Sequence, residues 1–448
     1  MEMKMNQSAT EKDQIYQLNG KISLAKAIPF GLQHILAMFI ANIAPVFIVA
    51  GACGMQDAQI AGLIQNAMII AGIGTMIQLY PIWKIGSGLP IVMGISFTFV
   101  SVFCFIGPTY GYETIVGAVL IGGILEGILG LFAKYWIRLI SPIVAATVVT
   151  AIGFSLLSVG ASSFGGGSGN EKFGSMENWI MGTVALVCCL GFQLLVKSYW
   201  KQLSALFGLL VGYLTAIGMG CVDFSSLKSA KLFALPQIMP FFMEFHPSAI
   251  LAVLVIFLVS ATETIGDTSA LVATGLNREV TAKEISGSIV CDGWISALSS
   301  IFGCMPITSF SQNVGLVSMT KVVNRFAIFT GAVIMVLAGF CPIFGALLAT
   351  MPDAVLGGCT IFMFGSIVLC GMQMIAKCGF TQRNITIAGL ALSIGLGFTQ
   401  VQGLFLEFPK MVQTVFGENC VAIVFVIAII LNLVLPKEAE EKMEEGAC

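Results

Sequence analysis

Residues 304–320, CMPITSFSQNVGLVSMT, gather hydroxyl and amide side chains in a chain whose neighbouring segments are almost entirely apolar. A similar stretch, GLPIVMGISFTFVSV, covers residues 88–102. Each has a Pro-Ile pair near its start, and a glycine follows at Gly94 or Gly315. Proline removes an amide donor and glycine weakens a helix, so neither stretch favours a continuous helix. We predict that each contains an extended piece that leads into a short helix.

The composition around these stretches is that of a membrane protein. Hydrophobic residues make up 57% of the 448 residues, charged residues only 10%, and the mean hydropathy is +0.96. A soluble domain would carry about 25% charged residues. The net charge of -2, without a basic patch, argues against a nucleic-acid partner. The 13 cysteines form no C-x-x-C pair, so neither a disulfide framework nor a metal site is predicted.

The apolar runs predict an all-α polytopic membrane protein with about fourteen transmembrane segments, each about 17 to 25 residues long. This count places all but four of the 21 Lys and Arg residues on the side of the two termini. Positive charge accumulates on the cytoplasmic side, so we expect a multi-pass protein of the plasma (inner) membrane with both termini cytoplasmic. Five of these segments carry or adjoin polar residues: span 3 at 90–106, span 8 at 248–275, span 9 at 283–302, span 10 at 305–320 and span 11 at 326–350.

Fourteen spans divide into two sets of seven, and an odd number forces the second set to enter the membrane in the opposite sense. This is the geometry of two inverted repeats, with short strands in the broken spans 3 and 10. Extended backbone is tolerated at membrane depth only where it is buried in protein or lines a cavity. A matched pair of interrupted spans therefore predicts a transport site.

Few ionisable groups fall within the spans, and each is costly to bury near the bilayer centre. Glu263 and Asp267 are four residues apart, which places both carboxylates on one face of span 8. Two such carboxylates should not both ionise easily, so the pair is suited to carrying a proton. The alternative is that they cap or cross-link helices.

Three further groups have structural alternatives. Asp292 in span 9 either serves the site or accepts hydrogen bonds from neighbouring backbone. His34 either serves the site or snorkels at the cytoplasmic end of the first span. Glu126 lies in GGILEGILGL, whose glycines indicate close helix contact, so we expect a structural role for it.

The stretch QNVGLVSMTK, residues 312–321, resembles the signature of the nucleobase-ascorbate transporter family, also called nucleobase:cation symporter-2. That pattern is Gln or Glu, Asn, any residue, Gly, four residues, Thr, and a basic residue or Gly. GLQHILAMF at 31–39 and ATETIGD at 261–267 support the resemblance, which covers essentially the whole chain.

The resemblance implies a core domain of spans 1 to 4 and 8 to 11 and a gate domain of spans 5 to 7 and 12 to 14. The implied parts are a cytoplasmic tail at 1–26, core segments at 27–139 and 248–350, gate segments at 140–247 and 351–436, and a cytoplasmic tail at 437–448. It also implies a homodimer. The substrate would lie between the strands of spans 3 and 10.

The resemblance further implies a secondary active transporter, not an enzyme, that imports xanthine or uric acid by symport. Glu263 and Gln312 would bind the base, because a Gln amide can pair with an edge that alternates N–H donors and carbonyl acceptors. We expect Ser96 and Phe97 to form the opposite wall, where Phe97 could stack on the ring. The remaining implied residues, with supporting or coupling roles, are Asn313, Asp267, Asp292 and His34.

Several alternatives stay open. No cofactor is expected; protons are the expected coupling ion, with sodium as the alternative. A uracil permease of the same family would have Glu at position 312 and His at position 267. An anion exchanger of related fold would favour a basic residue near the half-helix N-termini. A passive channel would not accumulate its substrate. Thr308, Ser309 and Ser311 are expected to satisfy the exposed backbone around them.

Overall fold

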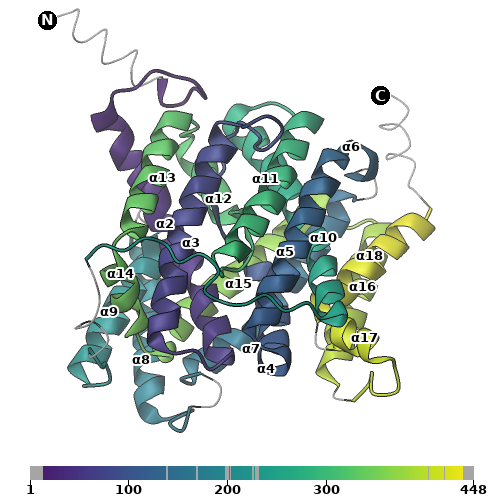
Figure 1. Cartoon of the computed structure of the whole chain (residues 1–448). Helices are drawn as coiled ribbons and strands as arrows, with labels where there is room; N and C mark the ends of the chain where they lie inside the picture. Colours follow the sequence, from purple (N-terminus) through teal and green to yellow (C-terminus); the bar gives the residue numbers. More distant parts are fainter. Residues whose placement is uncertain are drawn as a thin grey trace, which may run out of the picture.

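A computed structural model describes residues 14–137, 140–167, 170–196, 201, 203–224, 227, 232–401, 403–417 and 419–436. The predicted tail at 437–448, the first half of the tail at 1–26, and the predicted loop residues Arg138, Lys197, Lys228 and Lys231 lie outside these ranges. The chain is mostly helical, and its long helices run roughly parallel or antiparallel to one another (Figure 1).

One group of helices packs around the two broken stretches. Its long members are α2 (Leu24–Ala52), α3 (Asp57–Leu79), α5 (Tyr112–Leu131), α10 (Pro247–Leu271), α11 (Ala282–Ile301) and α13 (Arg325–Gly339). Its short members are η1 (Phe97–Phe99), α4 (Val100–Tyr110), α6 (Ala133–Trp136), η5 (Val272–Leu276), α12 (Ser311–Thr320) and α14 (Pro342–Ala349). The closest pairs in this group are α5 with α11 and α13 with both α2 and α3.

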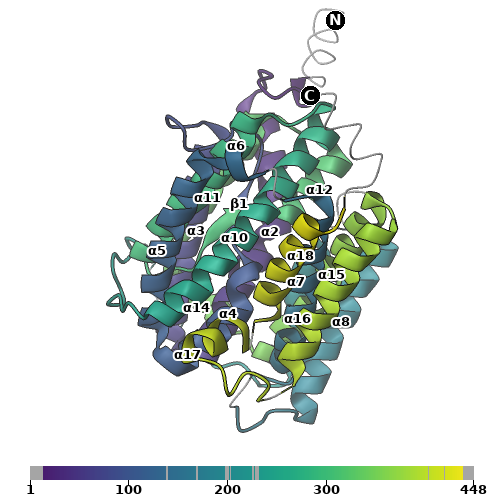
Figure 2. The same cartoon turned by 90° about the vertical axis from the view of Figure 1, so that its right-hand side faces the viewer.

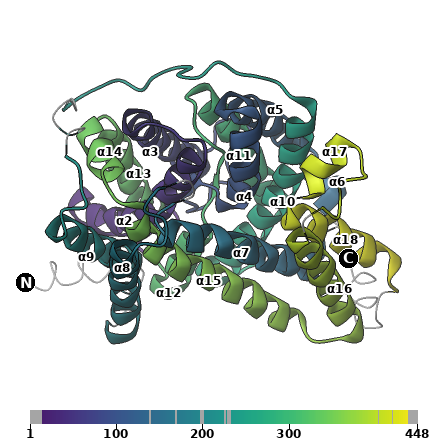
Figure 3. The same cartoon turned by 90° about the horizontal axis from the view of Figure 1, so that it is seen from below.

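The other helices form a second group beside the first. They are α7 (Pro142–Phe164), α8 (Met176–Leu195), α9 (Ser204–Gly218), α15 (Asp353–Cys378), α16 (Gln382–Gln400), α17 (Lys410–Val412), η6 (Gln413–Gly417) and α18 (Cys420–Val434). Helix α15 packs closely on α7 and α8, and α16 packs on α18. Seen from below, α7, α8, α15 and α16 of this group lie on one side of the molecule, and α3, α5 and α11 lie on the other (Figure 3).

Two three-residue strands lie deep among the helices, β1 (Met93–Ile95) and β2 (Ile307–Ser309). They pair antiparallel in the register Met93–Ser309, Gly94–Thr308 and Ile95–Ile307. All six residues are buried. A view turned by 90° shows β1 enclosed between α10, α11 and α2 (Figure 2).

The helix boundaries follow from local chemistry. Pro247 begins α10, where a missing amide donor is harmless because the first turn has no intrahelical acceptor for it. Thr281 and Glu284 form a capping box at the start of α11, and the Asn324 side chain caps α13. Pro342 has the opposite effect on predicted span 11: it starts a new helix, so α13 and α14 meet at 76° instead of forming one straight helix.

Within the described ranges, seven helices are long and apolar enough to cross a membrane, or up to nine if each of two bent helix pairs counts as one span. Two shorter apolar segments, Phe97–Tyr110 and Ser204–Gly218, add to these. The number and length of these helices are typical of a multi-pass integral membrane protein. The count of about fourteen spans stays a prediction.

Candidate functional site

The strand pair is extended by backbone hydrogen bonds on both sides. The Ser96 amide donates to the Pro306 carbonyl at 3.0 Å, and the Phe310 amide donates to the Val92 carbonyl at 3.0 Å. The chain then turns into helix directly after each strand, at η1 and α4 in the first stretch and at α12 in the second. Each stretch thus places the N-terminus of a short helix beside the strands, where the first turn has backbone N–H groups without the usual intrahelical acceptors.

Buried polar side chains hold the strands in place. Asn42 on α2 accepts a hydrogen bond from the Ile95 amide at 2.8 Å, and the Thr75 hydroxyl on α3 accepts one from the Met93 amide at 3.0 Å. On the other strand, the Ser296 hydroxyl on α11 accepts from the Ile307 amide at 3.1 Å. These bonds satisfy strand amides that no neighbouring strand reaches, which is what burial at this depth requires.

The two carboxylates of α10 face both stretches. Glu263 accepts a 2.6 Å hydrogen bond from the Thr98 hydroxyl and a 3.3 Å bond from the Ser311 hydroxyl. Asp267 accepts from Ser311 at 2.9 Å and from the Ser309 hydroxyl at 3.2 Å. Ser311 therefore bridges the two carboxylates, and Glu263 links the first stretch to the second.

Asp292 anchors β2 to α10. One of its oxygens accepts from the Thr264 hydroxyl at 2.6 Å and from the Ser309 amide at 3.1 Å. Its side chain is fully buried. Asp292 thus accepts a hydrogen bond from neighbouring backbone, as the structural alternative for it predicts. The same contacts also connect Asp292 to the Glu263–Asp267 pair, through Thr264 and Ser309.

His34 is buried, so the snorkelling alternative for it is wrong. The Asn313 amide group lies 3.1 Å from His34 Nδ1 and donates to the His34 backbone carbonyl at 3.0 Å. The His34 imidazole lies inside the helix group, since α2 continues beyond it to Asn42 and further. Its Nδ1 atom faces Asn313 in the first turn of α12. Asn313 therefore fixes the start of α12 against α2.

Of the predicted wall residues, Ser96 and Phe97 follow β1 and are buried. Phe97 makes an edge contact with Phe364 of α15, with ring centroids 5.3 Å apart, so it touches the second helix group. The Ser96 hydroxyl accepts from the Thr98 amide at 3.3 Å. Gln312 is half-buried in the first turn of α12, and its side chain makes no hydrogen bond to any residue that the structure describes. Its amide is therefore available for a ligand.

The prediction that Ser309 and Ser311 serve the surrounding backbone is wrong. Their hydroxyls donate to the side chains of Asp267 and Glu263 instead. The reason is that the strand amides are already met by Asn42, Thr75, Ser296 and Asp292, which leaves the hydroxyls free for the carboxylates. Sequence reasoning also missed Thr98, a hydroxyl between two phenylalanines, and Thr264, which directly follows Glu263 in a polar run.

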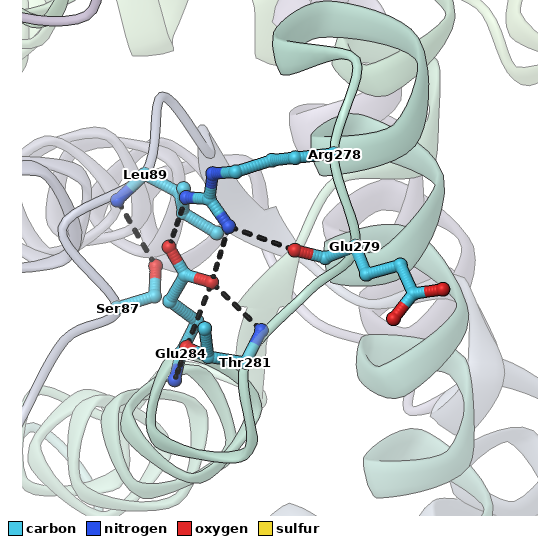
Figure 4. A network of polar contacts seen from close by, with 6 residues as sticks. All are labelled: Ser87, Leu89, Arg278, Glu279, Thr281 and Glu284. Atoms are coloured by element: carbon cyan, nitrogen blue, oxygen red, sulfur yellow. Dashed lines mark hydrogen bonds and ion pairs between the residues drawn. The ribbon is translucent and has the colours of Figure 1, made fainter. Parts of the chain in front are cut away.

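The end of the signature lies at one end of the helix group. Lys321 has a left-handed backbone, with φ of 59°, and its ammonium group donates to the Thr274 carbonyl at 2.9 Å. Nearby, Arg278 forms an ion pair with Glu284, which raises the pKa of the Arg278 guanidinium, and donates to the Glu279 carbonyl (Figure 4). These contacts tie η5 to the end of α12 and the loop after η5 to α11.

No group of three or more His, Cys, Asp or Glu side chains that could hold a metal ion is found among the described residues. The site combines two carboxylates bridged by Ser311, a third carboxylate on the strand backbone, and an amide that has no hydrogen-bond partner among the described residues. Such a set can accept N–H groups of a planar ligand and exchange a proton.

A family model described as "Permease family" matches residues 25–404. The chain belongs to the nucleobase-ascorbate transporter family. Members of this permease family are transporters, not enzymes, and the same holds for this chain.

Relatives cover nearly the full length. The xanthine permease XanQ of Escherichia coli (strain K12) is 31% identical over 439 residues, which are 95% of this chain and 94% of the relative. The uric acid permease PucK of Bacillus subtilis (strain 168) is 33% identical over 393 residues, 87% of this chain and 91% of the relative. The chain is thus a nucleobase transporter.

Solved structures of other transporters share the fold at low identity. The transmembrane domain of the cyanobacterium bicarbonate transporter BicA matches with a TM-score of 0.54 at 14% identity, over 93% of this chain and all of that domain. The murine anion transporter Slc26a9 in its inward-facing state matches with a TM-score of 0.57 at 10% identity, over 92% of this chain and 69% of that one. These likenesses concern the fold alone.

Proposed function

We propose that this transporter imports an oxidised purine, xanthine or uric acid, by proton symport. The observation that carries the proposal is the Gln312 amide in the first turn of α12, which has no hydrogen-bond partner among the described residues. It lies next to Ser311 and the carboxylate partners of Ser311, Glu263 and Asp267. The Gln312 amide would pair with the donor and acceptor edge of the purine, and Glu263 would accept from a ring N–H. Phe97 and Ser96 would form the opposite wall.

Protons are the proposed coupling ion because the site offers carboxylates bridged by a hydroxyl. Glu263 and Asp267 share Ser311 as a donor, so a change of charge on one of them alters the bonds of the other. Asp292 and the His34–Asn313 pair would support the site by holding β2 and α12. Sodium is the alternative coupling ion.

The architecture supports alternating access between two inverted seven-span repeats, about fourteen spans in all. The strands run antiparallel, as two segments that enter a membrane from opposite sides would. The helix group around the strands would be the core, at 27–139 and 248–350, and the second group would be the gate, at 140–247 and 351–436. Phe97 against Phe364 lies at their contact. A homodimer in the plasma membrane with cytoplasmic termini completes the proposal.

The rival substrates make different demands on the same site. A uracil carrier would resemble its family members in having Glu at position 312 and His at position 267, where this chain has Gln312 and Asp267. An anion exchanger would place positive charge at the short helices. Among the described residues, the side chains that hydrogen-bond at the first turn of α12 are acidic or neutral apart from His34.

The proposal is tested by uptake of labelled xanthine, urate and uracil in cells that lack their own carriers, with and without a protonophore. We expect accumulation of xanthine or urate that the protonophore abolishes. Accumulation driven by a sodium gradient would show that sodium, and not the proton, is the coupling ion. Equilibration without accumulation would indicate a channel, and the absence of uptake of all three bases would refute the purine proposal.

A further inference from the structure

Helices α5 and α11 cross at a contact between glycines. A Cβ atom at Gly293 would lie 2.2 Å from the Gly127 amide nitrogen and 2.6 Å from the Gly123 carbonyl oxygen. One at Gly123 would lie 2.6 Å from the Ala297 nitrogen. The two backbones thus touch, and the helices lie side by side in two views (Figures 1 and 3). Such small-residue contacts bring helices closer than side chains allow.

An acidic residue stands next to a glycine on each side of this crossing. Glu126 precedes Gly127, and Asp292 precedes Gly293. Both are buried, with exposed fractions of 1% and 0%. Neither oxygen of Glu126 has a hydrogen-bond partner among the described residues, nor does Asp292 Oδ1. The contact of Gly293 with Gly123 and Gly127 places Glu126 and Asp292 on facing turns of the two helices.

These three buried carboxyl oxygens have no donor among the described residues, so Glu126 and Asp292 cannot both be ionised without a counter-charge. An isolated ionised carboxylate in an apolar medium costs so much that the group takes up a proton or a cation instead. A hard metal cation would need about six oxygen ligands. A proton needs only a donor and an acceptor, and these two carboxyl groups supply both.

We infer that Glu126 and Asp292 share one proton and form a second proton-binding site, separate from the Glu263–Asp267 pair. The inference rests on the proposed proton symport for its role in transport. Asp292 connects the two sites, because its other oxygen accepts from Thr264 of α10 and from the Ser309 amide of β2. Loss of the shared proton would leave negative charge directly behind the strand pair.

The other elements packed on α5 bring no counter-charge to this crossing. Helix α10 presents Phe257 to Gly122, while its carboxylates Glu263 and Asp267 bond to the two stretches on another face. Helix α4 carries Cys104 and Tyr110 as its titratable groups. On α11 itself, the Cys291 thiol faces the Gly74 carbonyl and the Met93 sulfur, and Lys283 and Glu284 lie in the first turn. The other charged or titratable groups on neighbouring elements lie toward the ends of α5 or α3, and they are Tyr112, Glu113, Glu244, His246, Lys134, Tyr135 and Asp57.

The first test is infrared spectroscopy of the purified full-length protein, which detects the carbonyl stretch of protonated carboxyl groups. The variants are Glu126→Gln and, as a matched control on the same helix, Glu113→Gln. We expect the first to lose one protonated-carboxyl band present in the wild type and the second to keep it. Asp292→Asn should shift that band, because the proton is shared. It also serves if Glu126→Gln does not fold.

The second test separates coupling from binding in reconstituted vesicles. Glu126→Gln should still exchange labelled for unlabelled purine but should lose accumulation driven by a pH gradient. A wild-type infrared spectrum in Glu126→Gln overturns the inference, and a band that appears only when sodium is withdrawn overturns it in favour of sodium. If the wild type itself fails to transport purines while the band is still lost in Glu126→Gln, the shared proton of Glu126 and Asp292 stands, and the purine proposal fails.

Discussion

The two broken stretches have the same backbone shape and different chemistry. In each, a three-residue strand leads into a short helix, from Met93 to Tyr110 in the first stretch and from Ile307 to Thr320 in the second. The amides of β1 are met by neutral groups, Asn42 and Thr75. In the second stretch, the Ser309 amide and two hydroxyls meet carboxylates.

This difference indicates a division of labour between the repeats. The first stretch supplies shape and reaches a carboxylate through Thr98. The second supplies two hydroxyls that bind Glu263 and Asp267 and a backbone amide that binds Asp292. Substitutions in the surroundings of β1 should therefore act mainly on stability, and substitutions in the second stretch should act mainly on transport.

The largest effect is expected at Glu263, where the two stretches meet. Glu263→Gln keeps the volume of the side chain but removes the charge that Thr98 and Ser311 stabilise, and with it the ability to exchange a proton. We expect loss of purine uptake at every pH, with normal amounts of protein in the membrane. Uptake of labelled xanthine or urate, beside immunodetection of the carrier, measures this.

Glu177→Gln is the matched control for that change, because Glu177 is exposed and pairs only with Lys172 among the described residues. It should transport as the wild type does. Uptake by Glu263→Gln at more than a small fraction of the wild-type rate would show that Glu263 is structural, which was the alternative for this residue.

The next largest effect concerns the glycines of the two stretches. A Cβ at Gly94 would lie 2.7 Å from Met38 Cε, 2.9 Å from the Phe310 ring and 3.0 Å from Asn42 Oδ1, whereas one at Gly315 meets nothing within 4 Å. Gly94→Ala should destabilise the protein by about 1–3 kcal/mol through overpacking. Gly315→Ala should stabilise α12 by about 0.5–1 kcal/mol.

The melting temperatures of purified Gly94→Ala and Gly315→Ala measure these two changes in stability. They should move in opposite directions, although the sequence pattern treats both glycines alike. Equal effects would mean that the two stretches are packed alike and that the contrast between them is wrong.

The sequence predicts the membrane class and the family in this case because apolar length and a signature motif are local properties. Pro90 and Pro306 indicate the breaks for the same reason. The pairing of Ser311 with two carboxylates is not local: it depends on α10 and α12 lying together across 44 and 48 positions of the chain. The burial of His34 likewise depends on Asn313, which is 279 positions away.

A smaller contrast is expected between Asn42→Ala and Ser311→Ala. The first leaves the buried Ile95 amide without an acceptor, which costs about 1–3 kcal/mol and should lower the melting temperature while the protein that remains folded keeps its KM. The second removes a hydroxyl at an exposed residue, so stability should change little and the maximal uptake rate should fall. A reduced uptake rate in Asn42→Ala at unchanged stability would contradict the division of labour.

The smallest effect on transport rate, and the sharpest on selectivity, is expected at Gln312. Gln312→Glu removes the amide donor and keeps an acceptor, so the preference between purine and uracil should shift while transport continues. Gln382→Glu is the control, because Gln382 is exposed in the first turn of α16 and gains the same charge beside a helix N-terminus. Competition by unlabelled bases measures the preference. If Gln312→Glu kept the wild-type preference, the unpartnered amide would have no part in base recognition, and the second stretch would act through its carboxylate contacts alone.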